Sequence, residues 1–467
     1  MLFIISSFKT FLDNVRKSGD RMNYNLKIPS DVKYILSVLK NNGYEGYMVG
    51  GCVRDLLLKK KPNDYDITTD AKPDVVASLF DKVILTGVKH GTVTVILNNN
   101  QYEVTTYRQD GDYKDNRRPQ NVNFVNDIKE DLSRRDFTIN AMAYNEEKGL
   151  VDYFNGINDL DSKIIRTVGD PIKRFNEDSL RMLRAVRFSV QLNFKIDESV
   201  MEAIIVLSKN IKSISKERVR DEFNKIIIKN PKGLDILHKC NLLRYIISDL
   251  EKAYGGTQNK LYDINDLYEH SVRSACNVKS DLTLRLTMLL HDLGKLKPTT
   301  NECENISHHY GHSQESADMS EKILKSLKYD NNTISKVKVL IRYHDSILKS
   351  RFSVKKLLNI IGCELFEDLI VVMRADILAE NNLCKEEKIR DINNIEKIYN
   401  EIIREKECFS LKDLDINGKE LISIGVKKGR EVGIMLNYLL TNVMKNNNLN
   451  SKDNLIKIVE EKLNKKE

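Results

Sequence analysis

Residues 46–70, GYMVGGCVRDLLLKKKPNDYDITTD, decide the fold of the first part of the chain. A short β-forming run is followed by the glycine pair Gly50 and Gly51, a helix-forming stretch, and a second β-forming run that carries Asp64 and Asp66. Side chains two residues apart on a strand project from the same face of a sheet. The order therefore predicts a strand–helix–strand unit with two neighbouring carboxylates.

The same stretch contains the residue types that phosphoryl transfer requires. Mg²⁺ prefers carboxylate oxygens, and two such ions held by Asp64 and Asp66 would activate an attacking hydroxyl and steady a leaving pyrophosphate. Gly50 and Gly51 would let backbone amides approach a triphosphate, and Arg54 would neutralise its charge. Each signal is weak alone, because an Asp-x-Asp pair is usually an exposed turn. Together they predict a nucleotide and Mg²⁺ site.

The composition bounds the class of protein. A chain of 467 residues is too long for one core, so several domains are expected. The net charge of +8, with 30% charged residues, suits a partner that carries phosphates. The seven cysteines are scattered and form no Cys-x-x-Cys pair, which favours reduced thiols in the cytoplasm over a disulfide scaffold.

The N-terminus predicts neither a signal peptide nor a membrane span. Lys9 interrupts its short apolar run, and no small-residue cleavage site follows. A capped amphipathic helix is expected after Met22. We therefore expect Met22 to be the native start, residues 1–21 to be non-native or disordered, and the protein to have no membrane partner.

The remaining pattern divides the chain into a β-rich and a helical part. From about residue 45 to 155 the chain has short β-forming runs, and from about 160 onward nearly every segment has helical periodicity. The run GTVTVILNNNQYEVTTYR at 91–108 predicts a hairpin closed by three asparagines. The expected fold class is α+β, with a mixed β-sheet and helices in an N-terminal head and a long all-α body after it.

The order of these motifs resembles the head of the class II nucleotidyltransferase superfamily, which includes the CCA-adding enzymes and bacterial poly(A) polymerases. The segments TGVKHGTVTV at 86–95 and YEVTTYR at 102–108 are similar to the family's next strands. The resemblance implies that Glu103 is the third catalytic carboxylate. From its residues alone, Glu103 could equally be a charge on the exposed face of a hairpin.

Two further segments extend the resemblance. DLSRRDFTINAMAYN at 131–145 is similar to a family motif that meets sugar and phosphates, which implies that Arg135 contacts the nucleotide, with Asp136 and Asn140 nearby. The polar segment 110–122 resembles the family's flexible loop. Because that loop serves the switch from adding C to adding A, its presence argues against an enzyme that adds C only.

The stretch EDSLRMLRAVRF at 177–188 predicts a continuous helix with a charge at every third residue, Asp178, Arg181, Arg184 and Arg187. In isolation it would be an exposed ion pair and a solvated basic face. It falls, however, where the family has its base-reading motif. The resemblance implies that Asp178 and Arg181 read the base, while Arg184 and Arg187 hold ribose and phosphates or support that pair.

Chemistry explains why an acid and a guanidinium suffice for this reading. Cytosine and adenine both present an amine donor beside a ring-nitrogen acceptor, whereas uracil and guanine present a carbonyl beside a ring N–H. The carboxylate of Asp178 only accepts hydrogen bonds, and the guanidinium of Arg181 only donates them. A wrong base would leave buried groups of like polarity facing each other, which is costly.

The choice between CCA addition and polyadenylation rests on two further segments. The stretch VILTGVKHGTVTV at 83–95 has the form typical of CCA-adding enzymes and lacks the arginine-rich signature of poly(A) polymerases. Residues 416–440 resemble the tRNA-holding tail of CCA-adding enzymes of this class. We therefore expect CCA addition to tRNA from CTP and ATP, with a poly(A) polymerase as the alternative.

A second group of residues predicts a metal centre in the helical body. Six of the eight histidines lie between residues 270 and 344, and a neighbouring His and Asp inside the apolar TMLLHDLGK are costly to bury unless they bind something. Imidazole and carboxylate together suit a divalent transition metal. The order resembles an HD domain, whose activity would be phosphohydrolysis. The implied ligands are His270, His291, Asp292, His312, His344 and Asp376.

These expectations give a domain plan and leave two other classes of protein open. An HD phosphohydrolase whose head merely binds RNA, and a pure tRNA-binding protein, are both disfavoured by the intact Asp64, Asp66, Asp178 and Arg181. The oligomeric state is left open. The expected segments are the extension at 1–21, a catalytic head at 22–160, a base- and RNA-binding neck at 161–250, the HD domain at 251–385 and a tRNA-binding tail at 386–467.

Overall fold

The computed structural model describes residues 24–111, 122–255, 267–296, 311–380 and 385–464. The expected extension at 1–21 and most of the expected loop at 110–122 lie outside these residues. Contacts within the chain define two compact units. The first unit comprises Met1–Ile226 and Asp235–Tyr245, and the second comprises Ile227–Leu234 and Ile246–Glu467. Among the described residues, no helix is long and apolar enough to cross a membrane.

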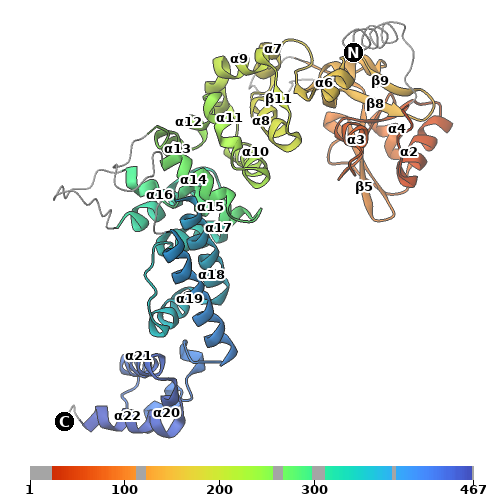
Figure 1. Cartoon of the computed structure of the whole chain (residues 1–467). Helices are drawn as coiled ribbons and strands as arrows, with labels where there is room; N and C mark the ends of the chain where they lie inside the picture. Colours follow the sequence, from red (N-terminus) through yellow and green to blue (C-terminus); the bar gives the residue numbers. More distant parts are fainter. Residues whose placement is uncertain (1–23, 112–121, 256–266, 297–310, 381–384, 465–467) are drawn as a thin grey trace, which may run out of the picture. The chain divides into compact units, whose positions relative to one another are not determined.

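The first unit is built on a seven-stranded mixed sheet with the strand order β3-β4-β5-β2-β1-β8-β9. Of these strands, β5, β8 and β9 are labelled in Figure 1. Neighbouring strands are antiparallel except β2 and β5, which run parallel. The strands are β1 (Gly46–Val49), β2 (Asp66–Thr69), β3 (Val83–Ile84), β4 (Thr92–Leu97), β5 (Asn100–Thr106), β8 (Met142–Asn145) and β9 (Gly149–Asp152). Short pairs are formed by β6 (Arg108–Asp110) with β7 (Val122–Phe124) and by β10 (Ile164–Ile165) with β11 (Lys195–Ile196).

The helices of the first unit flank and follow this sheet. A small core under the sheet contains the buried Tyr47, Tyr107 and Leu132. The helices are α2 (Ser30–Asn41), α3 (Gly51–Leu57), α4 (Pro73–Leu79), α5 (Ile128–Ser133), α6 (Gly156–Ser162), α7 (Pro171–Glu177), α8 (Leu180–Leu192) and α9 (Glu198–Leu207). The residues of α10 (Lys216–Lys229), α11 (Gly233–Lys239) and α12 (Leu243–Ile246) are divided between the two units.

The predicted hairpin at 91–108 is formed by β4 and β5. Leu97 pairs with Asn100, and the two residues between them, Asn98 and Asn99, have φ of 49° and 63°. Asparagine tolerates this left-handed conformation better than other residues with a side chain, and a two-residue turn of this kind matches the twist of its strands. The hairpin fixes the register of β5, and with it the position of Glu103 opposite Asp66 on the parallel neighbour β2.

Two expectations about local structure were wrong. Asp64 does not lie on the strand with Asp66, because β2 begins at Asp66. Residues 177–188 are not one helix, because α7 ends at Glu177 and α8 begins at Leu180. Asp178 between them has extended backbone, with φ of −141°, and its carboxylate accepts a hydrogen bond from the Leu180 amide at 3.0 Å. Aspartate competes in this way for amides at helix starts, which breaks the periodic pattern.

The second unit is helical throughout its described residues. A separate apolar cluster in its last part includes Leu421, Leu439, Val443, Leu455 and Val459. The helices are α13 (Ser248–Lys252), α14 (Leu267–Cys276), α15 (Leu282–Leu290), α16 (His312–Ser326), α17 (Asn331–Tyr343), α18 (Arg351–Ala379), α19 (Lys385–Arg404), α20 (Gly418–Ser423), α21 (Arg430–Lys445) and α22 (Lys452–Asn464). A mixed sheet with helices followed by a helical body confirms the expected α+β class.

Candidate active site in the head and candidate metal centre in the helical body

The glycine pair stands where the chain leaves β1 and enters α3. Gly50 has φ of +80°, a conformation that side chains with a Cβ rarely adopt, and its amide donates to the Met142 carbonyl at 3.1 Å. A Cβ on Gly50 would lie 2.9 Å from Nη1 of Arg135. Glycine is therefore required here both by its positive φ and by the close approach of the Arg135 guanidinium to the turn.

Three carboxylates lie beside this turn. Asp66 is half-buried at the start of β2 with Glu103 directly opposite, while Asp64 and Glu103 are exposed. Burial, together with the charges of Asp64 and Glu103, raises the pKa of Asp66 to about 6, although the Arg135 guanidinium opposes the rise. The three carboxylates thus form a patch of excess negative charge that one arginine only partly neutralises.

The residues at this patch fit the expected Mg²⁺. All three offer oxygen, which Mg²⁺ prefers, and a bound cation would favour the charged form of Asp66 that burial disfavours. The patch is open, since the carboxylate oxygens of Asp64, Asp66 and Glu103 do not all lie within 4.8 Å of one another. Mg²⁺ that keeps several waters and shares substrate phosphates needs only one or two protein carboxylates.

The position of Arg135 depends on a residue that sequence reasoning missed. Asp131, on α5, is fully buried and forms ion pairs with Arg135 at 3.5 Å and Arg134 at 2.7 Å. The Asp131 carboxylate also accepts a hydrogen bond from the Thr68 hydroxyl of β2 at 3.2 Å, which links residues 131–135 to the sheet. The signal available was an acid three and four residues before two arginines, a spacing that places them on one helix face.

Arg135 itself retains an unused donor. Its Nε is buried and finds no hydrogen-bond partner among the described residues. A buried donor of this kind is costly unless it is satisfied, so the position suits an incoming phosphate oxygen.

A chain of polar contacts joins the glycine turn to α8. Arg54 donates to Asn140 Oδ1 at 2.7 Å, and Asn140 donates to Asp136 Oδ1 at 3.4 Å. Asp136 in turn accepts from Nε of Arg184 at 2.7 Å. Burial would raise the pKa of Asp136, but the guanidinium groups of Arg184 and Arg181 outweigh it and hold that pKa at about 2. Arg54, Asn140, Asp136 and Arg184 therefore form one connected group.

Three of the guanidinium groups pack around the ring of Phe188. Arg187 lies 4.0 Å from the ring centroid, Arg54 5.2 Å and Arg184 5.3 Å. Cation–π attraction partly offsets the cost of holding these like charges together. Arg187 also forms an ion pair with the buried Glu222 of α10 at 2.6 Å. Sequence reasoning missed Glu222, which gives Arg187 a partner within the protein.

Asp178 and Arg181, the predicted base readers, are each held by a further partner. Arg218 on α10 donates to Asp178 Oδ2 at 2.9 Å, a contact that the sequence pattern did not suggest. Arg181 is buried and donates to Glu177 and to the carbonyls of Arg174 and Arg134, the last two at 3.1 Å. The break between α7 and α8 thus presents an acid and an arginine whose orientations are fixed by neighbours.

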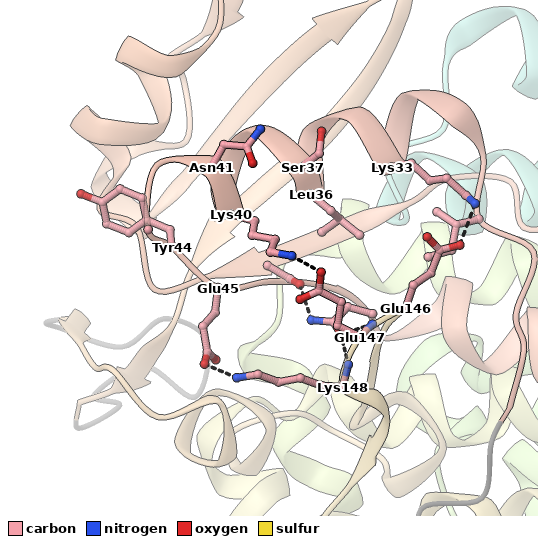
Figure 2. A pocket seen from close by; sticks show the side chains of 14 residues that line it. Lys33, Leu36, Ser37, Lys40, Asn41, Tyr44, Glu45, Glu146, Glu147 and Lys148 are labelled. Carbon is pink, nitrogen blue, oxygen red and sulfur yellow. Dashed lines mark hydrogen bonds and ion pairs between the residues drawn. The ribbon is translucent and has the colours of Figure 1, made fainter.

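The described head also contains a hollow of about 520 Å³ away from these groups, next to the start of β1 (Figure 2). Its lysines point to its glutamates, and the pairs are Lys33–Glu146, Lys40–Glu147 and Lys148–Glu45. Because these charges compensate one another, the hollow offers no net field for an anion, and the predicted site residues do not line it.

In the second unit, the six predicted ligands come together from five helices and their ends. His270 Nε2 is 2.8 Å from Asp376 Oδ1 and 3.2 Å from His291 Nε2. Asp292 Oδ1 lies 3.3 Å from His312 Nε2 and 3.6 Å from His344 Nε2. Two sets have ligand atoms within 4.8 Å of one another, His270 with His291 and Asp376, and His291 with Asp292 and His344.

The chemistry of this donor set fits a transition metal. Nδ1 of His291 and of His344 hydrogen-bonds a backbone carbonyl, at 2.8 and 2.7 Å, which directs Nε2 of each ring into the cluster. Oδ1 of Asp292 is buried without a hydrogen-bond partner among the described residues. Burial disfavours the charged form of Asp292 and of Asp376. The neighbouring histidines, and for Asp292 also Lys295, nevertheless hold the pKa of each carboxylate well below its usual range.

Comparisons with known proteins bear on the identity of the chain. Three family models match it, described as Poly A polymerase head domain (residues 46–166), Probable RNA and SrmB- binding site of polymerase A (193–254) and tRNA nucleotidyltransferase domain 2 putative (305–459). The CCA-adding enzyme of Ligilactobacillus salivarius is 34% identical over 449 residues, which cover 93% of this chain and 99% of that protein. The chain belongs to the CCA-adding enzyme family. The predicted nucleotidyltransferase class of enzyme is confirmed.

Other members of the family agree with this assignment. The CCA-adding enzyme of Oceanobacillus iheyensis is 55% identical over 192 residues, and this match spans 41% of the chain and only about half, 48%, of that relative. The crystal structure of the Bacillus stearothermophilus CCA-adding enzyme in complex with CTP covers 94% of this chain and 99% of its own, with a TM-score of 0.73 and 28% identity. The matching models name no HD domain, so that resemblance stays a prediction.

Proposed function

We propose that the chain adds C, C and A to the 3′ end of tRNA, using CTP and ATP and no nucleic-acid template. The observation that supports this most is the continuity of the site within one unit. The carboxylates Asp64, Asp66 and Glu103 adjoin Arg135, and the Arg54–Asn140–Asp136–Arg184 contacts lead from there to α8. These contacts would hold the proposed catalytic and base-reading groups in a fixed relation to each other.

Asp64 and Asp66 would hold Mg²⁺, with Glu103 beside them on the next strand. Two bound ions would supply activation of the tRNA 3′-hydroxyl and neutralisation of the departing pyrophosphate. Arg135 would donate its buried Nε to a phosphate of the nucleotide, next to the turn that Gly50 opens. The remaining catalysis is positioning, because phosphoryl transfer depends mainly on alignment and charge stabilisation.

Base choice would come from Asp178 and Arg181. A carboxylate can accept more than two hydrogen bonds, so Asp178 can take the base amine while Arg218 and the Leu180 amide hold it. Arg181 would donate to the ring nitrogen from an orientation set by Glu177. Uracil and guanine would place a carbonyl against Asp178 and an N–H against Arg181, which leaves both pairs unsatisfied.

The test incubates the protein with a tRNA lacking its 3′ end, Mg²⁺, and CTP and ATP separately and together. The expected result is two nucleotides with CTP alone and three, ending in A, with both. Long A tails from ATP alone would instead support the poly(A) polymerase. Asp64→Ala should abolish addition, and Asp74→Ala, which removes an exposed aspartate from the first turn of α4, should not. Full activity of Asp64→Ala would contradict the proposed site.

We propose a second function for the histidine cluster, metal-dependent hydrolysis of a phosphomonoester or a 2′,3′-cyclic phosphate. His270, His291, Asp292 and Asp376 would hold one transition-metal ion. His312 and His344 lie on the other side of Asp292 and would allow a second ion. The observation that supports this function is the buried Asp292 Oδ1, which lies near Nε2 of His312 and of His344 but accepts no hydrogen bond among the described residues.

The cluster is tested by metal analysis of the purified protein and by phosphatase and cyclic-phosphodiesterase assays. Hydrolysis that disappears in His291→Ala, while nucleotide addition persists, is the expected result. Hydrolysis without any nucleotide addition would favour the phosphohydrolase whose head only binds RNA. Absence of both activities, with tRNA still bound, would favour a tRNA-binding protein.

A further inference from the structure

The sheet of the head has a free edge at β9. This strand lies at one end of the strand order, and among the residues that the structure describes it pairs with β8 alone. The Gly50 amide donates to the Met142 carbonyl, so the backbone of Met142 faces β1 and not β9. Asp152 is the residue opposite Met142 in β9. The backbone N–H and C=O groups of Asp152, and of Leu150 two residues before it, therefore face away from the sheet.

A hollow of about 680 Å³ lies at this free edge. Its lining includes residues 150–153, residues 126–127 directly before α5, and the side chains of Tyr47 and Ile128. Tyr47 and Ile128 belong to the buried cluster under the sheet, and Val151 packs against that cluster. An added strand at this position would therefore continue both the hydrogen-bond ladder and the apolar core.

The lining of the hollow is net negative. Glu45, Asp127 and Asp152 contribute three carboxylates, and Lys148 is the one lysine of the described lining. Figure 2 shows that Lys148 is already paired with Glu45. Lys129 lies nearby, outside the lining, and still leaves the balance negative. This charge would repel the phosphates of RNA and attract a segment that carries a basic side chain.

We propose that the free edge of β9 binds an extended, basic segment of a partner protein as an additional strand. The backbone of the segment pairs with the outward groups of Leu150 and Asp152, whose spacing of two residues matches the repeat of a strand. An apolar side chain of the segment packs against Tyr47 and Ile128. A Lys or Arg two residues away lies on the same face and meets the Asp127 carboxylate. The hollow contains none of the predicted site residues, so this function is independent of nucleotide addition.

The first experiment uses the full-length protein and the peptide TVTKTVT, which places Val and Lys on one face of a strand and Thr on the other. Hydrogen exchange read by mass spectrometry should show that the peptide protects the Leu150 and Asp152 amides. In fluorescence anisotropy, TVTETVT should bind at least about tenfold more weakly, because it places a carboxylate against the acidic lining. Equal affinities of the two peptides, or no protection at about 1 mM TVTKTVT, would overturn the proposal.

The second experiment changes the edge and its charge separately. Leu150→Pro removes an outward N–H that takes no part in the ladder with β8, a position where an edge strand tolerates proline. It should weaken binding of TVTKTVT at least about tenfold. Asp127→Asn keeps a side chain that can cap α5 and should weaken TVTKTVT but not TVTETVT.

Both variants should retain nucleotide addition, and thermal melting checks that they fold. If Leu150→Pro does not fold, Asp127→Asn and the two peptides still test the proposal. Unchanged affinity for TVTKTVT in a folded Leu150→Pro protein, or in Asp127→Asn, would contradict it.

The exchange measurement also distinguishes three other occupants of the edge. Amides of Leu150 and Asp152 that are already protected in the protein alone would assign the edge to another segment of this chain. Protection that rises with protein concentration would assign it to a second copy. Protection by an RNA oligonucleotide and not by TVTKTVT would assign it to RNA. Each of these three results would overturn the proposal of a partner protein.

Discussion

The carboxylates of the head and the histidine cluster of the helical body collect their ligands in opposite ways. In the head, Asp64 and Glu103 are exposed, the donors are all oxygens, and they lie on adjoining strands and the loop before β2. In the cluster, His291 and Asp292 are almost fully buried, and nitrogen and oxygen donors come together from five helices. An open site suits a metal that arrives with a large, phosphate-bearing substrate, and a closed one suits a resident ion.

The largest effect that separates the two sites should come from Asp66→Asn. We expect it to reduce nucleotide addition by about a thousandfold, equal to roughly 4 kcal/mol of transition-state stabilisation, because a carboxamide binds Mg²⁺ poorly. The metal content of the histidine cluster should not change. The assay is single-turnover CTP addition, with Asp74→Asn as the control.

The same variant also has a stability readout. The pKa of Asp66 is raised to about 6 in the folded protein, so the folded state binds more protons than the unfolded state between pH 4 and 6. The contribution of Asp66 to stability is therefore present at low pH and lost as pH rises through 6. Without Mg²⁺ at pH 7.5, Asp66→Asn should melt higher than the unaltered protein. A lower melting temperature of Asp66→Asn than of the unaltered protein would contradict the conclusion that excess negative charge at Asp64, Asp66 and Glu103 destabilises the fold.

A second variant that separates the two sites is His291→Ala. We expect the bound transition metal to be lost, because His291 belongs to both sets of close ligand residues. Nucleotide addition should persist within about twofold, because the two sites lie in different units of the chain. Elemental analysis gives the metal content. His90→Ala, which removes an exposed histidine of the head, is the control and should retain the metal.

The sequence was informative where chemistry and local pattern coincide. The glycine turn and the Asn98–Asn99 hairpin were placed by residue type and spacing, and the six clustered ligands by the resemblance of their segments to an HD domain. In the first two cases a short segment determines its own geometry. In the third, histidines and aspartates inside apolar helices are too costly to bury unless they bind a ligand. The mixed sheet followed by helices could be predicted because strands and helices differ in their hydrophobic period.

The partners of the arginines could not be found in this way. Arg218 and Glu222 looked like ordinary helix charges, and only the packing of α10 brings them to Asp178 and Arg187. Asp131 is different, because it lies four residues before Arg135 and its spacing was a signal that went unused. The break between α7 and α8 at Asp178 was not predicted, because the Asp178 side chain caps the start of α8 and this overrides a periodic pattern that favours a continuous helix. Contacts between residues far apart in the chain depend on packing, which residue spacing does not contain.

A third prediction concerns base choice within the head. Arg181→Ala should raise incorporation of UTP relative to CTP by about 10–100-fold, since the preference rests on about 1–3 kcal/mol of unsatisfied polar groups. Arg218→Ala should give a smaller change in the same direction, because it loosens Asp178 without removing a donor to the base. The measurement is competition between the two nucleotides. If Arg218→Ala lowered the rates with CTP and UTP equally, Arg218 would support folding rather than orient the reading acid.

The smallest effect is a pH dependence that only the head should show. Because the pKa of Asp66 is about 6 and its charged form binds Mg²⁺, addition should fall about tenfold per pH unit once the pH is below that value. Mg²⁺ competes with the proton for the same carboxylate, so raising Mg²⁺ should shift the midpoint to lower pH. The rate is measured from pH 4.5 to 8 at two Mg²⁺ concentrations, with the fold followed by circular dichroism. If the midpoint pH did not change with the Mg²⁺ concentration, the titrating group would be one other than Asp66. The distinction between an open, cation-dependent site and a closed cluster would then lose its strongest support.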